Sequence, residues 1–457
     1  MKYQPYPRYK PSGVEWLGEV PEHWEAGHLR RFAAMKTGHT PSRTEPGYWA
    51  DCEIPWFTLA DVWQLRNGKQ IYLGETKERI SRMGLANSAA ELLPTGTVVF
   101  SRTASIGFSG IMPEPMATTQ DFWNWVPGPK LISEFLLYQF RAMSQEFTRF
   151  TMGSTHKTIY QPDAARLCTC VPPIAEQQAI VTHISRQTAK LDTLVEKKRT
   201  LIERLKEKRT ALISRTVTRG LPPDAARAVG LDPHPKLKPS NIDWLGDVPE
   251  HWLVKPLGRV VRFAGGATPD KGKPEYWDGE IPWVSPKDMK VMRIANVPDH
   301  VTQEGLANSA LILLPVKSVL IVVRGMILAH SFPVAISDVP VTINQDMKAI
   351  EVGTQLEAEF VLWVLTGIAP VFVSLADESA HGTRKLESEV IAKVCLPVPP
   401  RDEQVSIIAF LERETSRLDA MVEKIETAID RLQEYRTALI TAAVTGKIDV
   451  RGQTPTA

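Results

Sequence analysis

Residues 12–24 read SGVEWLGEVPEHW, and residues 240–252 read SNIDWLGDVPEHW. Eight of the nine residues at 16–24 recur unchanged at 244–252, an offset of 228 residues. Self-similarity at a fixed offset is the first signal to interpret, because it sets the architecture of the whole chain. A repeat of this length is too long for one solenoid unit. The chain is therefore predicted to contain a duplicated pair of domains.

The duplication extends along the chain in one order, with small gaps. The matched segments are Tyr48-Trp49 with Tyr276-Trp277, residues 53–56 with 280–283 (both EIPW), residues 84–89 with 305–310 (both GLANSA), Gln120-Asp121 with Gln345-Asp346, residues 171–173 with 398–400 (both VPP), and Glu176-Gln177 with Glu403-Gln404. The first part of each copy is rich in Trp, Pro, Gly and β-branched residues. Buried strands are expected at 97–100 and 319–323, and helices at 133–150 and 356–375.

The second part of each copy is predicted to be one long helix. Residues 176–219 and 402–445 contain neither proline nor glycine, and each run stops at a glycine. Both runs repeat with period seven, which favours a coiled coil. The repeating positions are Ile184, Leu191, Leu205 and Leu212 in the first run, where Lys198 interrupts the apolar pattern, and Leu411, Leu418, Ile425, Leu432 and Leu439 in the second. The first run has a net charge of +6 and residues 402–447 have −3, so the two helices are expected to pair with each other, antiparallel.

These patterns predict an α+β protein with a pseudo-twofold arrangement. We expect a first globular domain at 1–173, a first long helix at 174–220, a second globular domain at 221–400, a second long helix at 401–447 and a flexible tail at 448–457. Two non-identical domains held by paired helices could grip two sites at a fixed separation, as a split DNA site requires.

Composition limits the possible classes. The chain has 457 residues, 43% of them hydrophobic, and 54 Lys+Arg against 52 Asp+Glu, a net charge of +2. It is not a polycation, so any nucleic-acid contact must come from local patches. Four cysteines exclude a disulfide scaffold. We expect no metal site, no signal peptide and no membrane span, because residues 1–13 lack an apolar stretch and the longest uncharged run, 360–376, is too short. The expected location is the cytoplasm.

The repeated motifs resemble the specificity subunit of type I restriction–modification enzymes. The resemblance rests on residues 12–24, on the GHTPSRTEPGYW run at 38–49 with EIPW after it, and on VPPIAEQQAIV at 171–181, and it covers essentially the whole chain. It implies that each compact part is a target recognition domain that reads one half of a split sequence in double-stranded DNA. It also implies that the paired helices set the spacer and dock two methyltransferase subunits, that motor-nuclease subunits join them, and that the chain itself is not catalytic and needs no cofactor.

Three segments of each compact part supply side chains suited to DNA. Arginine and lysine pair with guanine, asparagine and glutamine pair with adenine, and small hydroxyls contact phosphates. The candidates in the first copy are Lys36, Thr40, Ser42, Arg43, Ser101, Arg102, Gln120, Ser154, Thr155, His156 and Lys157. Those in the second copy are Thr268, Lys271, Lys273, Arg324, Gln345, Thr383, Arg384 and Lys385. Positions that differ between copies are expected to discriminate bases, and for each residue an ordinary exposed loop is the competing interpretation.

Catalytic signatures are mostly missing from the sequence. It has no phosphate-binding P-loop and no Asn-Pro-Pro-Tyr/Phe methyltransferase motif. Asp270, Asp288 and Lys290 have the spacing of a loose Mg²⁺-dependent nuclease motif, which is the enzymatic alternative. A protein–protein scaffold built on the coiled coil is the other alternative. His23 and His251 sit beside Trp24 and Trp252, where packing and hydrogen bonding are the expected role.

Overall fold

The computed structural model describes residues 3–103, 105–150, 158–378 and 382–452. The chain forms two compact units. Unit 1 combines Met1–Lys198 with Glu426–Ala457, and unit 2 is the continuous segment Arg199–Ile425. Each unit therefore contains one globular part and a stretch of both long helices. The mixed content of helices and strands confirms the predicted α+β class.

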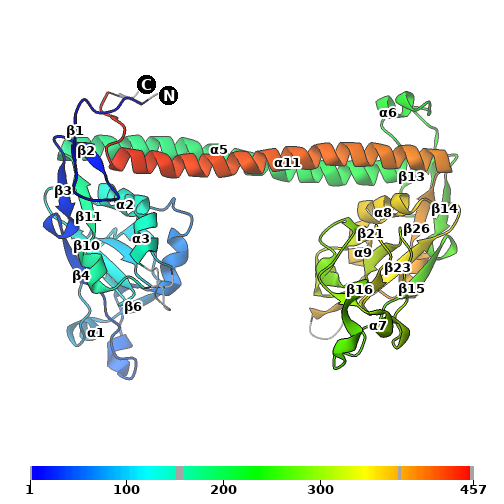
Figure 1. Ribbon diagram of the computed structural model, residues 1–457, viewed down its shortest axis with the longest axis horizontal. Helices are drawn as coiled ribbons and strands as arrows, with labels where there is room; N and C mark the ends of the chain where they lie inside the picture. The colour runs from blue at the N-terminus through cyan, green and yellow to red at the C-terminus, as the bar shows by residue number, and fades with distance from the viewer. Residues whose placement is uncertain (1–2, 104, 151–157, 379–381, 453–457) are drawn as a thin grey trace. The chain divides into compact units, whose positions relative to one another are not determined.

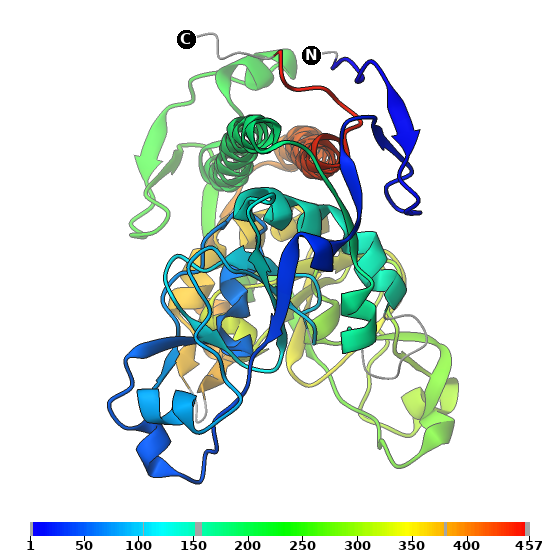
Figure 2. The same cartoon turned by 90° about the vertical axis from the view of Figure 1, so that its left-hand side faces the viewer.

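Unit 1 is built around a four-stranded antiparallel sheet in the order β4-β10-β7-β8 and a smaller sheet β6-β5-β9. Its strands are β1 Tyr9–Pro11, β2 Glu19–Pro21, β3 Glu25–His28, β4 Ala33–Thr37, β5 Ile54–Phe57, β6 Glu78–Ile80, β7 Val98–Ser101, β8 Ser109–Ile111, β9 Ala117–Thr118, β10 Phe122–Pro127 and β11 Cys168–Val171; its short helices are α1 Arg82–Ala86, α2 Ser133–Ala142, α3 Ser144–Phe150 and α4 Gln161–Ala165. Helix α2 lies between the four-stranded sheet and the long helices, so it joins them into one core (Figures 1 and 2).

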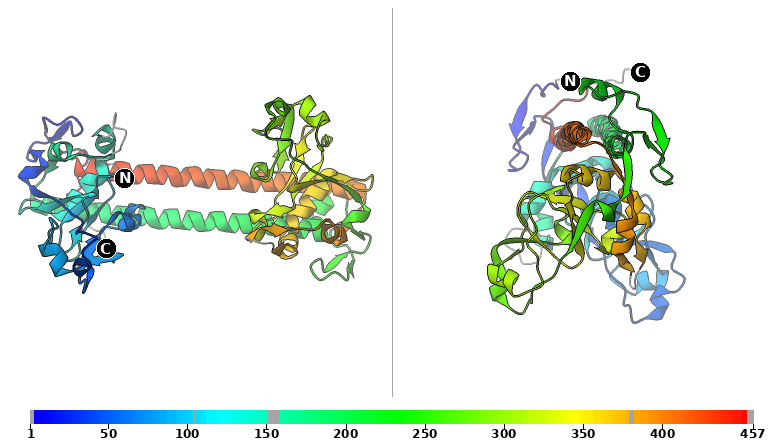
Figure 3. Two further views of the ribbon diagram at one scale, coloured as in Figure 1. Left: turned by 90° about the horizontal axis from the view of Figure 1, so that it is seen from below. Right: turned by 90° about the vertical axis from the view of Figure 1, so that its right-hand side faces the viewer.

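Unit 2 repeats this plan with a five-stranded sheet β15-β23-β19-β21-β17 and two three-stranded sheets, β18-β16-β22 and β20-β25-β24. Its strands are β12 Leu237–Pro239, β13 Asp247–Pro249, β14 Leu253–Pro256, β15 Val261–Gly265, β16 Trp277–Val284, β17 Arg293–Ile294, β18 His300–Val301, β19 Val319–Val322, β20 Arg324–Gly325, β21 Val334–Ser337, β22 Thr342–Ile343, β23 Met347–Val352, β24 Asp377–Glu378, β25 Arg384–Lys385 and β26 Cys395–Val398; its short helices are α6 Pro223–Ala228, α7 Gln303–Ala307, α8 Ala358–Gly367, α9 Ala369–Ser374 and α10 Ser388–Lys393. Figure 3 shows the hairpin β12–β13 and α6 beside the ends of the long helices.

The buried strands and the helices between them follow the sequence pattern closely. Strands β7 and β19 are buried along their whole length, and each starts within one residue of its predicted position. The two predicted helices are each broken once. The first is interrupted at Met143 and the second at Ile368, directly after Gly367 and shortly before Pro370. Glycine and proline both disfavour a helix interior, which accounts for the second break.

The two long helices are α5, Ile174–Arg219, and α11, Arg401–Val444. In unit 1, Ile180 and Ile184 share a core with Ile440 and Val444. In unit 2, the C-terminal part of α5 packs in the same way on the N-terminal part of α11. Low numbers on one helix meet high numbers on the other, so the predicted antiparallel pairing is present within each unit.

Both helices use two positions per heptad to form the contact surface, which we call the seam. The second position, four residues after the first, was missed in the sequence pattern. The seam residues, all buried or half-buried, are Ile184, Thr188, Leu191, Val195, Lys198, Ile202, Leu205, Arg209, Leu212 and Thr216 on α5, and Leu411, Thr415, Leu418, Val422, Ile425, Ile429, Leu432, Arg436, Leu439 and Ala443 on α11. The alternation of four and three residues is that of a coiled coil.

One repeated glutamine ties each globular part to its long helix. The Gln177 amide donates to the carbonyls of Pro172 and Lys130 at 2.8 and 2.7 Å, and its oxygen accepts from the Ile132 backbone N–H at 2.9 Å. Gln404 repeats all three bonds in unit 2, with the carbonyls of Pro399 and Gln355 and the N–H of Glu357. The glutamine recurs in both copies because it hydrogen-bonds the start of each long helix to the backbone of the globular part.

No helix in the described part of the chain is both long and apolar enough to cross a membrane. All four cysteines are free thiols.

Candidate nucleic-acid interface

Two of the segments predicted for unit 1, residues 36–43 and 101–102, meet with Gln120 at one edge of its main sheet, and the third, residues 154–157, lies outside the described residues. The loop after β4 is fixed to the end of β9 by a bond from the His39 N–H to the Thr118 carbonyl, 3.0 Å. The Thr40 hydroxyl donates to the side-chain oxygen of Gln120 at 2.7 Å. The Arg102 N–H donates to the Asp121 carbonyl at 2.9 Å. Polar side chains from distant parts of the chain are therefore brought together on one exposed surface.

The same edge is rebuilt in unit 2 from the duplicated segments. The Ala267 N–H donates to the Ile343 carbonyl at 3.0 Å, and the Thr268 hydroxyl donates to the side-chain oxygen of Gln345. Arg324 lies two residues after the end of β19 and pairs with Lys385 across the two short strands β20 and β25. We call these two surfaces the reading edges of unit 1 and unit 2.

Glycine is required where the loops of each reading edge approach one another. A Cβ atom on Gly38 would lie 2.1 Å from the Thr118 carbonyl oxygen, and one on Gly266 would lie 2.0 Å from the Asn344 carbonyl oxygen. No side chain fits at such distances, so the absence of a side chain brings the Thr and Gln of each pair into contact.

Three cations of the reading edges are paired with carboxylates. Lys36 pairs with Glu91 at 2.8 Å, and Arg43 pairs with Glu78 at 2.6 Å while its guanidinium covers the Trp49 ring at 3.9 Å. In unit 2, Lys385 pairs with Glu387 at 2.5 Å. Exposed pairs of this kind contribute little to stability, so a phosphate can replace the carboxylate at small cost.

The arginine that follows the central strand differs between the two units. Arg102 is half-buried, stacks on Trp123 with its guanidinium carbon 4.7 Å from the ring, and leaves its Nε atom buried without an acceptor among the described residues. Arg324 is exposed. Met326 and Ile327, next to Arg324, are also exposed, and Met326 has 71% of its surface accessible. Sequence reasoning did not single out these two residues, although an apolar pair one residue after a candidate arginine could have indicated them.

The remaining predicted residues are found in varied settings. Ser42 hydrogen-bonds to Thr44 at 2.8 Å, and Lys271 is exposed. A hydrogen bond to the Tyr276 hydroxyl, 3.0 Å long, raises the pKa of Lys273. Ser101 is buried and its hydroxyl donates to the Thr103 carbonyl, so it does not face solvent. Thr383 and Arg384 are half-buried. Ser154, Thr155, His156 and Lys157 lie outside the described residues.

The nuclease alternative does not fit the local geometry. The Asp288 carboxylate accepts hydrogen bonds from the backbone and hydroxyl of Ser285, at 2.9 and 2.7 Å, and thereby caps the 3₁₀ turn Pro286–Asp288. Asp61 caps the turn Leu59–Leu65 in the same way through Thr58. Asp270 accepts from the Gly272 N–H at 2.9 Å. Asp288 is thus the unit 2 copy of a framework cap, and its role in the turn speaks against the nuclease alternative.

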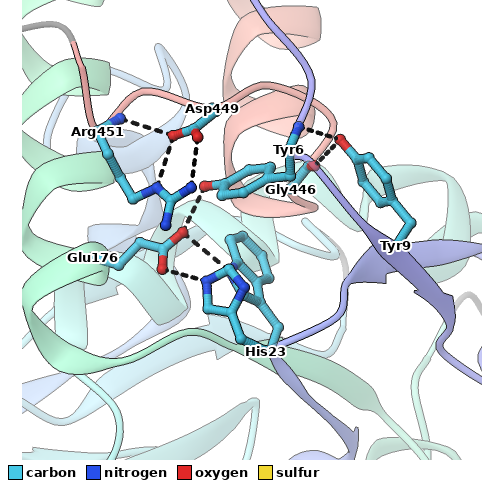
Figure 4. Close-up of polar contacts among 8 residues, drawn as sticks. Tyr6, Tyr9, His23, Glu176, Gly446, Asp449 and Arg451 are labelled. Atoms are coloured by element: carbon cyan, nitrogen blue, oxygen red, sulfur yellow. Dashed lines mark hydrogen bonds and ion pairs between the residues drawn. The ribbon is translucent and has the colours of Figure 1, made fainter.

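His23 belongs to a buried polar network that we call the Glu176 cluster (Figure 4). The Glu176 carboxylate accepts from the Tyr6 hydroxyl at 2.6 Å and from the Trp24 indole at 3.1 Å, and it contacts His23 at 2.8 Å. Burial and the bond to Glu176 raise the pKa of Tyr6. The guanidinium of Arg451 covers the Tyr6 ring at 4.8 Å. His23 thus hydrogen-bonds to a buried carboxylate, which agrees with its expected role in packing and hydrogen bonding.

Unit 2 contains a smaller version of this cluster. His251 contacts Glu403 at 2.8 Å, but the indole N–H of Trp252 is buried without an acceptor among the described residues. Unit 1 differs because residues from both ends of the chain close over its carboxylate. Asp449 and Arg451, which fall within the predicted flexible tail, form an ion pair at 2.6 Å in this cluster.

Comparison with known proteins gives one family. The sequence model of the type I restriction modification DNA specificity domain matches residues 21–204 and again residues 249–431. The specificity subunit of the Escherichia coli restriction enzyme EcoR124I/EcoR124II is 31% identical over 181 residues, which is 39% of this chain and 45% of that protein. The specificity subunit of the Methanocaldococcus jannaschii enzyme MjaIX is 25% identical over 276 residues, 60% of either chain. The alignments thus span about half of these relatives.

Two solved structures have the same fold. A chain from a structural study of complex assembly in the type I R-M system superposes with a TM-score of 0.65 at 16% identity, covering 95% of this chain and 99% of its own. The HsdS subunit from Thermoanaerobacter tengcongensis superposes with a TM-score of 0.51 at 17% identity, covering 94% and 98%. At this identity, the likeness establishes the fold alone.

Proposed function

This chain belongs to the family of type I restriction modification DNA specificity domains and contains two copies of the domain, and on that premise we propose that it is a DNA sequence-specificity subunit. Each globular part reads one half of a bipartite site in double-stranded DNA. The long helices set the spacer between the halves. The chain itself binds the DNA and positions the other subunits on it. The methylation and cleavage of the DNA are carried out by those subunits.

One observation supports this proposal above the others. In both units the loop after the first strand of the main sheet, the repeated Gln-Asp pair and the arginine after the central strand converge to form a reading edge, yet the side chains around them differ. The Thr–Gln pair is kept, as Thr40–Gln120 and Thr268–Gln345. The neighbours are different, because unit 1 has a stacked, half-buried Arg102, whereas unit 2 has an exposed Arg324 followed closely by the exposed Met326. A common frame with different contacts is what two unlike half-sites require.

The proposed partners are two methyltransferase subunits and motor-nuclease subunits, and the proposed location is the cytoplasm. The exposed faces of α5 and α11, opposite the seam, offer the docking surface for the methyltransferases. The family to which the chain belongs supports this assignment.

Genome-wide mapping of methylated bases by long-read sequencing tests the function directly. We expect a host with an active locus to show one bipartite motif whose methylation disappears when this chain is deleted. Arg324→Ala should relax a single position in the half-site read by unit 2, because losing one base-reading arginine removes roughly 1–3 kcal/mol of discrimination. Arg102→Ala should act on the other half-site. Unchanged motifs in both variants would reject these residue roles, and the lack of any bipartite motif in the wild type would reject the function.

A further inference from the structure

Each long helix places an arginine in the seam where an apolar residue is expected. These are Arg209 on α5 and Arg436 on α11, at equivalent positions of the two repeats. Their side chains are 26% and 17% exposed. Heptad positions of this kind normally hold leucine, isoleucine or valine, and a polar residue there lowers stability while it restricts the geometry of the coiled coil.

In unit 1, Arg436 connects three elements. Its Nε atom lies 3.4 Å from Asp192 on α5, and one of its terminal nitrogens donates to the Gly68 carbonyl at 3.0 Å. Gly68 lies in the loop that follows the turn Leu59–Leu65 of the recognition domain. A single side chain therefore connects both long helices to the globular part of the unit.

In unit 2, Arg209 makes the corresponding connections with the helices exchanged. Its Nε atom lies 3.0 Å from Asp419 on α11, and a terminal nitrogen contacts the Met292 sulfur at 3.6 Å. Met292 lies shortly after the turn Pro286–Asp288, the counterpart of the turn before Gly68. The two arginines thus hold the same place in both units, although the sequence around their targets differs.

An arginine at these two seam positions is expected to stabilise the helix pair less than a leucine or isoleucine would. Each Nε atom is buried and lies within ion-pair distance of an aspartate oxygen, but among the described residues neither has a partner at the angles of a hydrogen bond. Both ion pairs are partly exposed, since Asp192 is 25% and Asp419 57% accessible, so they add little stability and are better explained by the geometry that they select.

A second arginine reinforces each connection by a different route. In unit 1, Arg141 donates to the Gln70 carbonyl at 2.5 Å, and burial, with a smaller contribution from Arg436, lowers its pKa to about 10. In unit 2, Arg293 reaches Glu412 on α11 at 3.5 Å. The loop after the capped turn is thus anchored by two arginines in each unit.

We propose that Arg209 and Arg436 are positioning residues that fix the orientation of each recognition domain on the helix pair and thereby restrict the DNA site to one spacer length. This rests on the proposed function. Adding one base pair to a spacer moves a half-site by about 3.4 Å and turns it by roughly 34° around the DNA axis. A recognition domain free to rotate on the helices can follow such a shift, and a locked one cannot.

The test is the double variant Arg209→Met with Arg436→Met in the full chain, examined by methylation mapping in its host. Methionine fills the seam with a flexible apolar side chain, so the helix pair is preserved. We expect the two half-sites to stay the same, while spacers one base pair shorter and longer become methylated at about a tenth or more of their genomic sites. Methylation confined to the native spacer would overturn the proposal.

The matched control is Arg204→Met with Arg431→Met. These two arginines occupy equivalent positions in the repeats but are exposed and outside the seam. The control removes the same charges from the same helices, and its spacer should stay native. If the control relaxes the spacer to the same extent, the loss of helix charge accounts for the effect and the proposal fails.

A second variant separates orientation from helix pairing. Asp192→Arg with Arg436→Asp keeps an ion pair across the helices but cannot donate to the Gly68 carbonyl. If the double methionine variant is not folded, the charge-swapped protein is tested under the same criteria with purified complex and duplexes of varied spacer. A flattened spacer preference supports the proposal, and an unchanged preference overturns it. A wild type that prefers no spacer would instead reject the proposed function.

Discussion

Glu176 shows how one buried carboxylate can organise a whole region. It accepts hydrogen bonds from Tyr6 and Trp24 and contacts His23, so every side-chain oxygen has a partner. A buried charge is tolerated only when it is satisfied in this way. The cluster therefore makes residues near both ends of the chain part of the core of unit 1.

Tyr6→Phe should destabilise unit 1 by about 1–3 kcal/mol, because it removes a donor to a buried carboxylate. The matched control is Tyr160→Phe, since Tyr160 is exposed. Urea unfolding of the full chain measures both free energies. Equal stability of the two variants would show that the Tyr6 hydroxyl contributes nothing.

Asp449 gives the Glu176 cluster a defined pH dependence. Its hydrogen bond to Arg451 lowers the pKa of Asp449 below its ordinary value of 3.8. A carboxyl group whose pKa is lower in the folded state stabilises the fold above pH 3.8 and loses this contribution as the pH falls through the folded-state pKa.

Asp449→Asn should consequently lower the melting temperature at pH 7, and the difference from the wild type should shrink below about pH 3.8. Thermal unfolding of both proteins at several pH values from 7 to 3 provides the measurement. A difference that stays constant over this range would contradict the assignment.

The long helices illustrate what periodicity predicts and what it leaves open. Leu411, Leu418 and Leu439 predicted one contact position per heptad, because leucines that recur every seven residues indicate a coiled-coil contact. The second position was hidden, since Thr188, Arg209 and Arg436 occupy it alongside Val195 and Ile202. A polar residue in the seam is visible only when its distant partner is known.

Ile202→Ala should cost about 2–4 kcal/mol, because it leaves a cavity in the seam. The adjacent Leu201 is exposed, so Leu201→Ala is expected to change the stability by no more than about 0.5 kcal/mol. Chemical denaturation compares the two variants. If the two substitutions lower the free energy of unfolding equally, Ile202 does not belong to the seam.

The reading edges were only partly predictable. Arg102 and Arg324 could be found because each follows a buried strand, and Thr40 and Gln120 because they recur as Thr268 and Gln345. The contact between the threonine and the glutamine of each pair could not be predicted, since it depends on Gly38 and Gly266 bringing remote loops together. Burial of Ser101 was equally hidden, because its place at the end of a strand does not reveal which way its side chain points.

For the whole molecule, DNA affinity should fall steeply with salt, with a slope of about −0.9 in log K against log salt for each phosphate neutralised. Lys271 is an exposed loop lysine of the unit 2 reading edge, and Lys271→Ala should make the slope shallower by about one. Lys424→Ala, which removes an exposed lysine from α11, is the matched control. Titrations by fluorescence anisotropy at several salt concentrations give both slopes, and equal slopes would remove Lys271 from the interface.

The duplication and the α+β class followed from the sequence alone, because a repeat of this length permits few other architectures. Which segments of the chain make up each unit could not be predicted from the sequence. Unit 1 is assembled from two separated segments, and the reason is the antiparallel pairing, which returns the last part of α11 to the first part of α5.

That discontinuity determines the order in which a ribosome can deliver the protein. Unit 2 is continuous and can fold as soon as it has emerged, whereas unit 1 must wait for Glu426–Ala457. At usual translation speeds, the intervening segment takes roughly 10–45 s to synthesise. During that time the nascent unit 1 exposes the apolar surface that α11 will later cover, so a premature stop codon near the 3′ end should yield a product with an intact unit 2 and an aggregation-prone unit 1.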